Sequence, residues 1–323
     1  MFKKYLYIIL VTTLFFINIP NVSANEHQHR IRKIAEKYDL TGKGVSIAIL
    51  DTGYSGSNLN IIKKFNVIYG GDNIEDINGH GTLIANIIGS NDFGIAPEAE
   101  LYIIKVLEKN AFGKYATVIK GIEKAIQYDV DIILMSLGGT EYSKDIEHII
   151  KRALKKGIVV ISAVGNDGLS KEDTIRYPAK LNGVIGVGAV NESGHRWFRS
   201  SRGEGIDIMA PGENFKSVDQ KNNETRISGT SVAAAYLSGF VSLMLQDKRN
   251  MTNEQMINML SKYSEKEKDV ISYGKGILNE EETLKQLRRS NIYSNTLKAG
   301  IIIFILLSMY FLIKKFNEKK SFF

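Results

Sequence analysis

Two hydrophobic patterns alternate along the chain, and this alternation restricts the fold more than any other property of the sequence. Largely apolar runs typical of buried strands lie at Val45–Leu50, Leu101–Leu107, Asp131–Met135, Ile158–Ala163 and Val184–Val190. Segments with helical periodicity lie among them, at His80–Ile88, Tyr115–Gln127, Ser143–Lys156 and from Ser231 onward. Strands that alternate with helices are joined by right-handed crossovers into a parallel sheet. We therefore predict an α/β fold with helices on both faces of a parallel sheet.

The first 24 residues have the composition of a secretory signal. Lys3 and Lys4 precede a nearly unbroken apolar run over residues 5–19, and small residues follow up to Ala24. This order of basic, apolar and small residues predicts a signal peptide over residues 1–24, cleaved after Ala24. An uncleaved membrane anchor is the alternative.

A second apolar segment lies near the other end, where Ala299–Ile313 contains no charged residue. As a helix it would span roughly 22 Å, less than the hydrocarbon core of a bilayer at about 30 Å. The side chains of Lys298 and Lys314 can extend this span by reaching toward the interface. We predict a transmembrane helix over residues 297–313 and a basic cytoplasmic tail over 314–323. A short buried core helix is the alternative.

One large domain is expected between these two segments. Residues 25–261 would form it, and the highly charged residues 262–296 would follow as a terminal helix and stalk. The net charge of +7 is concentrated beside the two apolar segments, which indicates membrane flanks and does not support nucleic-acid binding. The chain has no cysteine, which excludes disulfides, a thiolate zinc site and a cysteine nucleophile.

The sequence also contains the groups that a serine needs to hydrolyse a peptide. These are a hydroxyl, a base, a carboxylate that orients the base, and a donor for the oxyanion. Each occurs at the end of a predicted strand or the start of a predicted helix, in the order Asp51, His80, Asn166 and Ser231. Taken singly, each has a simpler explanation as a turn, a structural histidine or a helix cap. Because strand ends meet at one edge of a parallel sheet, their joint occurrence predicts a catalytic site.

Longer motifs surround these residues. In chain order they are GKGVSIAILDTG at Gly42–Gly53, GHGT at Gly79–Thr82, GIAPEAELY at Gly94–Tyr102, MSLGG at Met135–Gly139, AVGN at Ala163–Asn166, YPA at Tyr177–Ala179, APG at Ala210–Gly212 and GTS at Gly229–Ser231. Together they resemble the subtilisin-like (S8) family of serine proteases. The resemblance covers residues from about Gly42 to about Leu245.

The resemblance implies a role for each candidate residue. Asp51 would orient the base, His80 would be the base, and Ser231 would be the nucleophile. Asn166 would donate to the oxyanion. The three motifs that carry Asp51, His80 and Ser231 follow the order of the family, which makes the signal specific.

The resemblance also bears on substrate and metal binding. Ser136, Leu137 and Gly138 would pair with the backbone of an extended peptide as an added strand. No cofactor is implied. The segment Leu83–Ile95 is shorter than in relatives whose calcium loop interrupts this helix, so we expect no metal site there.

Two further departures from the family concern packing and maturation. Many relatives have Pro-His where this chain has Ala235-Tyr236, which is expected to change helix packing and not the triad. Only Asn25–Lys43 separates the predicted cleavage point from the first strand, too little for a folded inhibitory prodomain.

The sequence therefore predicts a membrane-anchored serine endopeptidase with its catalytic domain outside the cell. Its expected partners are an extended peptide or protein substrate and the membrane, without nucleic acid. The substrates are either secreted peptide precursors, as for the lantibiotic leader peptidases of this family, or surface proteins in general. An inactive, protease-like binding protein is the alternative from another class, and the presence of all four site residues argues against it.

Overall fold

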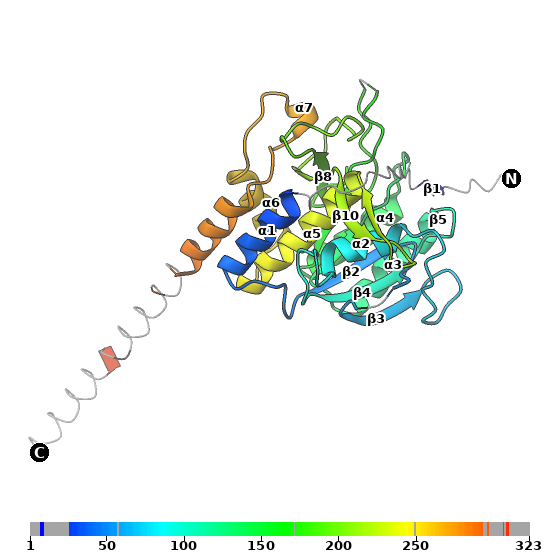
Figure 1. The fold of residues 1–323 in the computed structure, drawn as a ribbon, viewed down its shortest axis with the longest axis horizontal. Helices are drawn as coiled ribbons and strands as arrows, with labels where there is room; N and C mark the ends of the chain where they lie inside the picture. Colours follow the sequence, from blue (N-terminus) through cyan, green and yellow to red (C-terminus); the bar gives the residue numbers. More distant parts are fainter. Residues whose placement is uncertain are drawn as a thin grey trace, which may run out of the picture.

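The computed structural model describes residues 7–9, 26–56, 58–170, 172–248, 250–292, 296, 306 and 308–309. Its centre is a sheet of seven strands in the order β3-β4-β2-β6-β7-β8-β9 (Figure 1). Their bounds are β2 Ser46–Asp51, β3 Ile61–Asn66, β4 Glu100–Lys105, β6 Ile132–Met135, β7 Val159–Ala163, β8 Ile185–Val190 and β9 Ile208–Pro211. All six neighbouring pairs are parallel, which confirms the predicted α/β class.

Helices cover both faces of this sheet. The helices α2 (His80–Gly89) and α5 (Thr230–Asp247) share a hydrophobic core with Ile47 and Ile49 of β2. The helices α3 (Tyr115–Gln127) and α4 (Lys144–Lys155) share a second core with the intervening residues of the same strand. Because successive side chains of a strand point to opposite faces, both sets must be apolar, which explains the largely apolar runs.

Helix α5 is buried along almost its whole length, and it ties the two ends of the domain together. The ring of Tyr236 is completely buried, and its hydroxyl donates to Glu280 Oε1 at 2.6 Å. Arg30 of α1 (Glu26–Lys37) pairs with the other oxygen of Glu280 at 3.0 Å. Burial, with Glu280 beside it, raises the pKa of Tyr236 well above its ordinary value. Tyr236, at a position where many relatives have histidine, therefore anchors α1 and the C-terminal region on α5.

The C-terminal region continues this domain. After α6 (Asn253–Lys262) and the short α7 (Val270–Tyr273), a further helix covers residues 280–292. Leu278, Leu284 and Leu287 are buried in the core that contains α5. This part of the expected stalk therefore packs against the domain.

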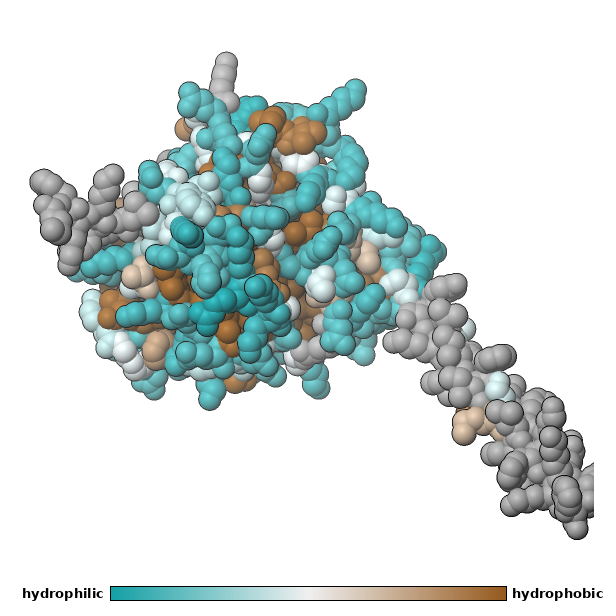
Figure 2. Space-filling model, turned by 180° about the vertical axis from the view of Figure 1, so that it is seen from behind, coloured by the Kyte–Doolittle hydropathy of each residue, from teal (hydrophilic) through white to brown (hydrophobic). Residues whose placement is uncertain are grey.

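A small hairpin completes the region around α2. It consists of β10 (Phe215–Val218) and β11 (Glu224–Ile227), paired antiparallel. Ser217 Oγ in β10 donates to the carbonyl oxygen of Leu83 at 2.9 Å, which fixes the hairpin against α2. Figure 2 shows that the apolar residues on one face of the molecule are scattered among hydrophilic ones.

The two predicted membrane-related segments lie largely outside the described residues. Within residues 1–24, Tyr7–Ile9 form β1, which pairs antiparallel with β5 (Phe112–Lys114). Within residues 297–313, only 306, 308 and 309 are described. Among all the residues that the structure describes, no helix has both the length and the apolar character needed to cross a bilayer.

Candidate active site

The structure brings Asp51 and His80 together. Asp51 is the last residue of β2 and His80 is the first residue of α2, and both side chains are buried. The distance between Asp51 Oδ1 and His80 Nδ1 is 2.8 Å. A carboxylate can only accept hydrogen bonds, so Nδ1 carries the proton and Nε2 is the basic nitrogen.

Ser231 is the second residue of α5, and its hydroxyl donates to the carbonyl oxygen of Ser136 at 3.2 Å. In return, Ser136 Oγ donates to the carbonyl oxygen of Ser231, also at 3.2 Å. Nε2 of His80 is buried and makes no hydrogen bond within the described part of the chain. The sequence places His80 and Ser231 at the starts of helices, which the structure also shows, but it does not predict that Ser231 bonds to Ser136. Such contacts of a nucleophile are often loose before substrate binds.

Asp76, which the sequence reasoning missed, holds the loop that presents His80. Its side chain is 1% exposed. Oδ1 accepts from the backbone N–H of Gly79 at 2.8 Å, and Oδ2 accepts from both the N–H and the hydroxyl of Thr82 at 2.8 and 2.7 Å. The signal was available, because an acidic residue shortly before a helix start commonly caps its free N–H groups.

Lys105 is a second missed residue, and it places a cation beside Asp51. It ends β4 and is the register partner of Asp51 across the parallel strands. Its Nζ donates to the carbonyl oxygen of Thr52, and the side chain is buried. Burial lowers the pKa of Lys105, while the nearby Asp76 and Asp51 act in the opposite direction. A lysine at the end of an otherwise apolar strand is the signal that could have identified it.

Asn166 follows β7, and its side chain is oriented by Thr230. Oδ1 of Asn166 accepts from the backbone N–H of Thr230 at 3.0 Å and from its hydroxyl at 2.8 Å. The Thr230 hydroxyl also accepts from the N–H of Gly165 at 3.3 Å. Both bonds engage Oδ1, and Nδ2 lies near the start of α5, 3.4 Å from where a Cβ atom on Gly229 would lie. This positions a donor near the positive end of α5, where Ser231 lies.

The segment Ser136–Gly138 leaves the end of β6 and runs past Ser231. Ser136 and Leu137 are buried, and Ser136 makes the two contacts with Ser231 described above. The next residue, Gly139, exchanges two hydrogen bonds of 2.8 Å with the backbone of Tyr177. The segment is therefore fixed at both ends.

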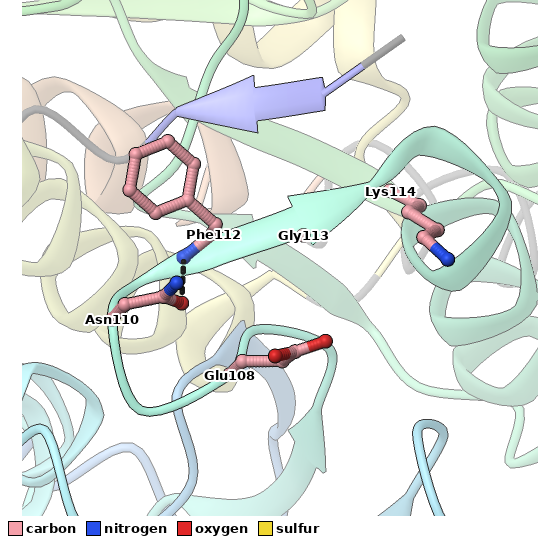
Figure 3. A pocket seen from close by; sticks show the side chains of 5 residues that line it. All are labelled: Glu108, Asn110, Phe112, Gly113 and Lys114. Atoms are coloured by element: carbon pink, nitrogen blue, oxygen red, sulfur yellow. Dashed lines mark hydrogen bonds between the residues drawn. The ribbon is translucent and has the colours of Figure 1, made fainter. Parts of the chain in front are cut away.

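A pocket of about 360 Å³ lies beside β5 (Figure 3). It is lined by Glu108, Asn110, Phe112, Gly113 and Lys114. The side chain of Asn110 accepts a hydrogen bond from the N–H of Phe112 at 3.1 Å, and β1 passes next to Phe112 in this view.

This pocket region adjoins the loop of His80. Asn78 Nδ2 donates to the carbonyl oxygen of Lys109 at 2.9 Å, and Asn78 Oδ1 accepts from the N–H of His80 at 3.3 Å. One asparagine therefore links the turn before β5 to the loop that presents the histidine.

No metal-binding cluster is found where the structure gives positions. Among those residues, no three or more histidine, aspartate or glutamate side chains are grouped so that they would hold an ion. Helix α2 runs from His80 to Gly89 without an inserted loop.

Comparisons with known proteins agree with this architecture. The sequence profile of the subtilase family matches residues 42–280. Subtilisin DY of Bacillus licheniformis is 37% identical over 248 residues, which cover 74% of this chain and 90% of the relative. Subtilisin E of Bacillus subtilis (strain 168) is 36% identical over 248 residues, 74% of this chain and 65% of its own length.

A crystal structure of a cold adapted subtilisin-like serine proteinase superimposes with a TM-score of 0.67 at 26% identity. The superposition covers 75% of this chain and 89% of the other. The family match includes the region that contains the site. The chain therefore belongs to the subtilase family and is a serine peptidase.

Proposed function

We propose that this peptidase hydrolyses peptide bonds through an acyl-enzyme on Ser231, with His80 as the base and Asp51 as its orienting carboxylate. The observation that carries this proposal is the buried hydrogen bond of 2.8 Å between Asp51 and His80. It fixes the histidine tautomer in which Nε2 is the basic nitrogen. Nε2 has no hydrogen-bond partner among the described residues and is available to take the proton of a nucleophile.

The reaction then follows from the placement of these groups. A rotation of the Ser231 side chain exchanges its bond to Ser136 for one to Nε2 of His80. Oγ attacks the scissile carbonyl carbon while Nε2 takes its proton, and the oxyanion is stabilised by Asn166 Nδ2. Nε2 gives the proton to the leaving amine, the C–N bond breaks, and an ester remains on Ser231. Nε2 takes a proton from water, which attacks this ester, and then gives that proton to Ser231 Oγ as the ester bond breaks and the carboxylic acid leaves.

We propose that the substrate binds as an extended strand between Ser136–Gly138 and β5. Both lie next to the site, since Ser136 contacts Ser231 and the turn before β5 contacts Asn78. The antiparallel pairing of β5 with Tyr7–Ile9 supports this mode, because it places an extended backbone at the edge of β5. Backbone pairing of this kind gives affinity for extended peptides, and side-chain pockets give specificity.

The expected activity is hydrolysis of unstructured peptides by the full-length protein in detergent. A fluorophosphonate should stop it, because the reagent reacts with an activated serine hydroxyl, whereas a metal chelator should leave it unchanged. The measurement is cleavage of a fluorogenic peptide library with either reagent. Inhibition by the chelator alone would point to a metallopeptidase contaminant or to a different mechanism.

We further propose that the domain is exported and held at the outer face of the cell membrane. Residues 1–24 carry the signal pattern, and residues 297–313 carry an apolar run followed by four lysines in the tail. A basic tail after an apolar span favours a cytoplasmic position for that tail. An enzyme held in this way is suited to process secreted peptide precursors as they leave the cell.

The proposed membrane anchor implies that the protein is found in the membrane fraction. The full chain should remain with the membrane after washes with salt and carbonate, and a chain truncated after residue 296 should appear in the culture fluid. A reporter fused after Phe323 should be active only in the cytoplasm. An externally active reporter would contradict the proposed topology, while leaving the peptidase assignment intact.

A further inference from the structure

Arg176 lies beside the candidate active site, yet neither the family resemblance nor the mechanism above assigns it a role. Its backbone N–H donates to the carbonyl oxygen of Val164 at 3.0 Å, which places it against the segment that leads to Asn166. The next residue, Tyr177, pairs with Gly139 on the other side. Arg176 is therefore held between the two segments that reach the nucleophile and the oxyanion donor.

Two glycines make room for the Arg176 side chain. A Cβ atom on Gly138 would lie 2.9 Å from Arg176 Cβ, and one on Gly165 would lie 3.0 Å from its Cγ and Cδ. Both distances are too short for ordinary carbon contacts, and Gly165 also has a φ of +109° that disfavours a side chain. The arginine stem therefore occupies a slot that these two segments leave open only because they have no side chains there.

Most of the hydrogen-bonding capacity of this arginine is unused. Its side chain is 12% exposed, and Nε donates to Asp167 Oδ2 at 2.6 Å. Among the residues that the structure describes, Nη1 and Nη2 have no acceptor. A guanidinium presents these N–H groups as a planar fork that matches a carboxylate. The slot thus contains a largely buried cation with donors that face no protein partner.

In the binding mode proposed above, this slot also receives the side chain of the residue just before the scissile bond. The scissile carbonyl must meet Ser231 Oγ with its oxygen toward Asn166, and the preceding backbone runs along Ser136–Gly138. The side chain of the residue just before the scissile bond then points between Gly138 and Gly165. The Arg176 side chain lies in this gap.

We propose that Arg176 selects an acidic residue, glutamate or aspartate, immediately before the scissile bond. This rests on the function proposed above and extends it to a substrate class. The substrate carboxylate accepts two hydrogen bonds from Nη1 and Nη2, which is the geometry that makes arginine pairs with carboxylates strong. An amide of the same shape can accept only one of them and carries no charge.

The carboxylates near Arg176 point to the competing outcome, a preference for a basic substrate residue. Asp167, its partner, is 32% exposed, and a basic substrate residue would be attracted to it. The other acidic group of this loop that pairs nearby, Asp173, is already bonded to Lys180 at 2.6 Å. Arg176 is the more buried member of its pair, so its donors gain more from a substrate partner than the solvated Asp167 does.

The test measures kcat/KM of the full-length protein in detergent on four peptides that differ only in the residue before the scissile bond. The four residues are glutamate, glutamine, lysine and leucine. We expect the glutamate peptide to exceed the glutamine peptide by on the order of 10- to 100-fold, the range for a hydrogen-bonded charge pair. In Arg176→Gln this ratio should fall to about one, while the leucine peptide is still cleaved.

Lys180→Gln is the matched control, because it removes one positive charge from the same loop outside the slot. It should keep the preference for glutamate. Asp167→Asn should increase that preference, since Arg176 loses its neutralising partner. Better cleavage of the lysine or leucine peptide than of the glutamate peptide by the unmodified enzyme would overturn the inference. Failure to cleave any of the four, with no labelling of Ser231, would instead contradict the proposed function.

Discussion

Ser231→Ala is expected to lower turnover by about 10⁶-fold, the general scale for loss of the nucleophile in subtilisins. The same substitution should abolish covalent labelling by a fluorophosphonate. The physical reason is that Ser231 Oγ is the atom that becomes acylated, and alanine leaves nothing in its place. Its hydrogen bond to Ser136 is a single contact of 3.2 Å, so the fold should survive its loss. The measurement is peptide hydrolysis together with mass spectrometry of the labelled protein.

Ser238→Ala provides the matched control for this experiment. Ser238 lies on the same helix, is fully buried, and donates to the carbonyl oxygen of Ala234 at 2.8 Å. Its removal should leave labelling and hydrolysis close to those of the unmodified enzyme. If the Ser231→Ala protein were still labelled at a serine, another residue would be the nucleophile.

The sequence predicted the interior of the sheet better than its edges. β2, β4, β6, β7 and β8 were found because both of their faces are largely buried and their residues are mostly apolar, although β4 begins at Glu100 and ends at Lys105. The edge strand β3 was missed because three of its six residues are exposed, two of them the lysines Lys63 and Lys64. The other edge strand, β9, is only four residues long and ends in Pro211. β3 is largely solvated, so its composition differs little from that of a loop, whereas β9 is buried and was missed because it is short.

Helix α1 was missed for a related reason. Only a narrow stripe of it, Ile31, Ile34 and Ala35, is buried in the core, and the rest of the helix is polar or charged. Its position depends on the long-range contact between Arg30 and Glu280, which are 250 positions apart. No local pattern contains that information.

The candidate site shows the same division between local and long-range information. Motifs singled out Asp51, His80, Asn166 and Ser231 as candidates, because each motif is a short stretch of chain with its own turn or helix start. They did not predict that Ser231 bonds to Ser136. Which acceptor a hydroxyl finds depends on segments that are distant in sequence and meet only in the folded chain.

Asp76, Thr230 and Lys105 were overlooked because their role is to hold other residues. Asp76 and Thr230 are ordinary helix-start residues in the sequence, and Lys105 resembles any lysine at a strand end. Their significance appears only once the structure shows what they contact. Arg176 belongs with them, since its slot is formed by two glycines from different segments.

Asn166→Ala is expected to lower kcat by roughly 10²–10³-fold, the general scale for an oxyanion-hole side chain in subtilisins, with little change in KM. Nδ2 of Asn166 would donate to the oxygen only after it becomes an oxyanion, so its loss affects the transition state and hardly affects the bound substrate. The two bonds from Thr230 to Oδ1 prepare this orientation before substrate arrives. The measurement is steady-state hydrolysis of one peptide by the variant and the unmodified enzyme.

Asn166→Asp distinguishes the loss of the Nδ2 donor from the loss of the side chain's shape. Aspartate has nearly the same shape and still accepts both bonds from Thr230, so the loop that carries it should keep its structure. It lacks the donor, however, and places a negative charge where the oxyanion forms. Its loss of kcat should therefore be at least as large as that of alanine. Thr230→Val removes the hydroxyl's bond to Oδ1 and its bond from the Gly165 N–H but keeps the backbone bond to Oδ1, so it should cost less than either. Full turnover in Asn166→Ala would show that another group stabilises the oxyanion.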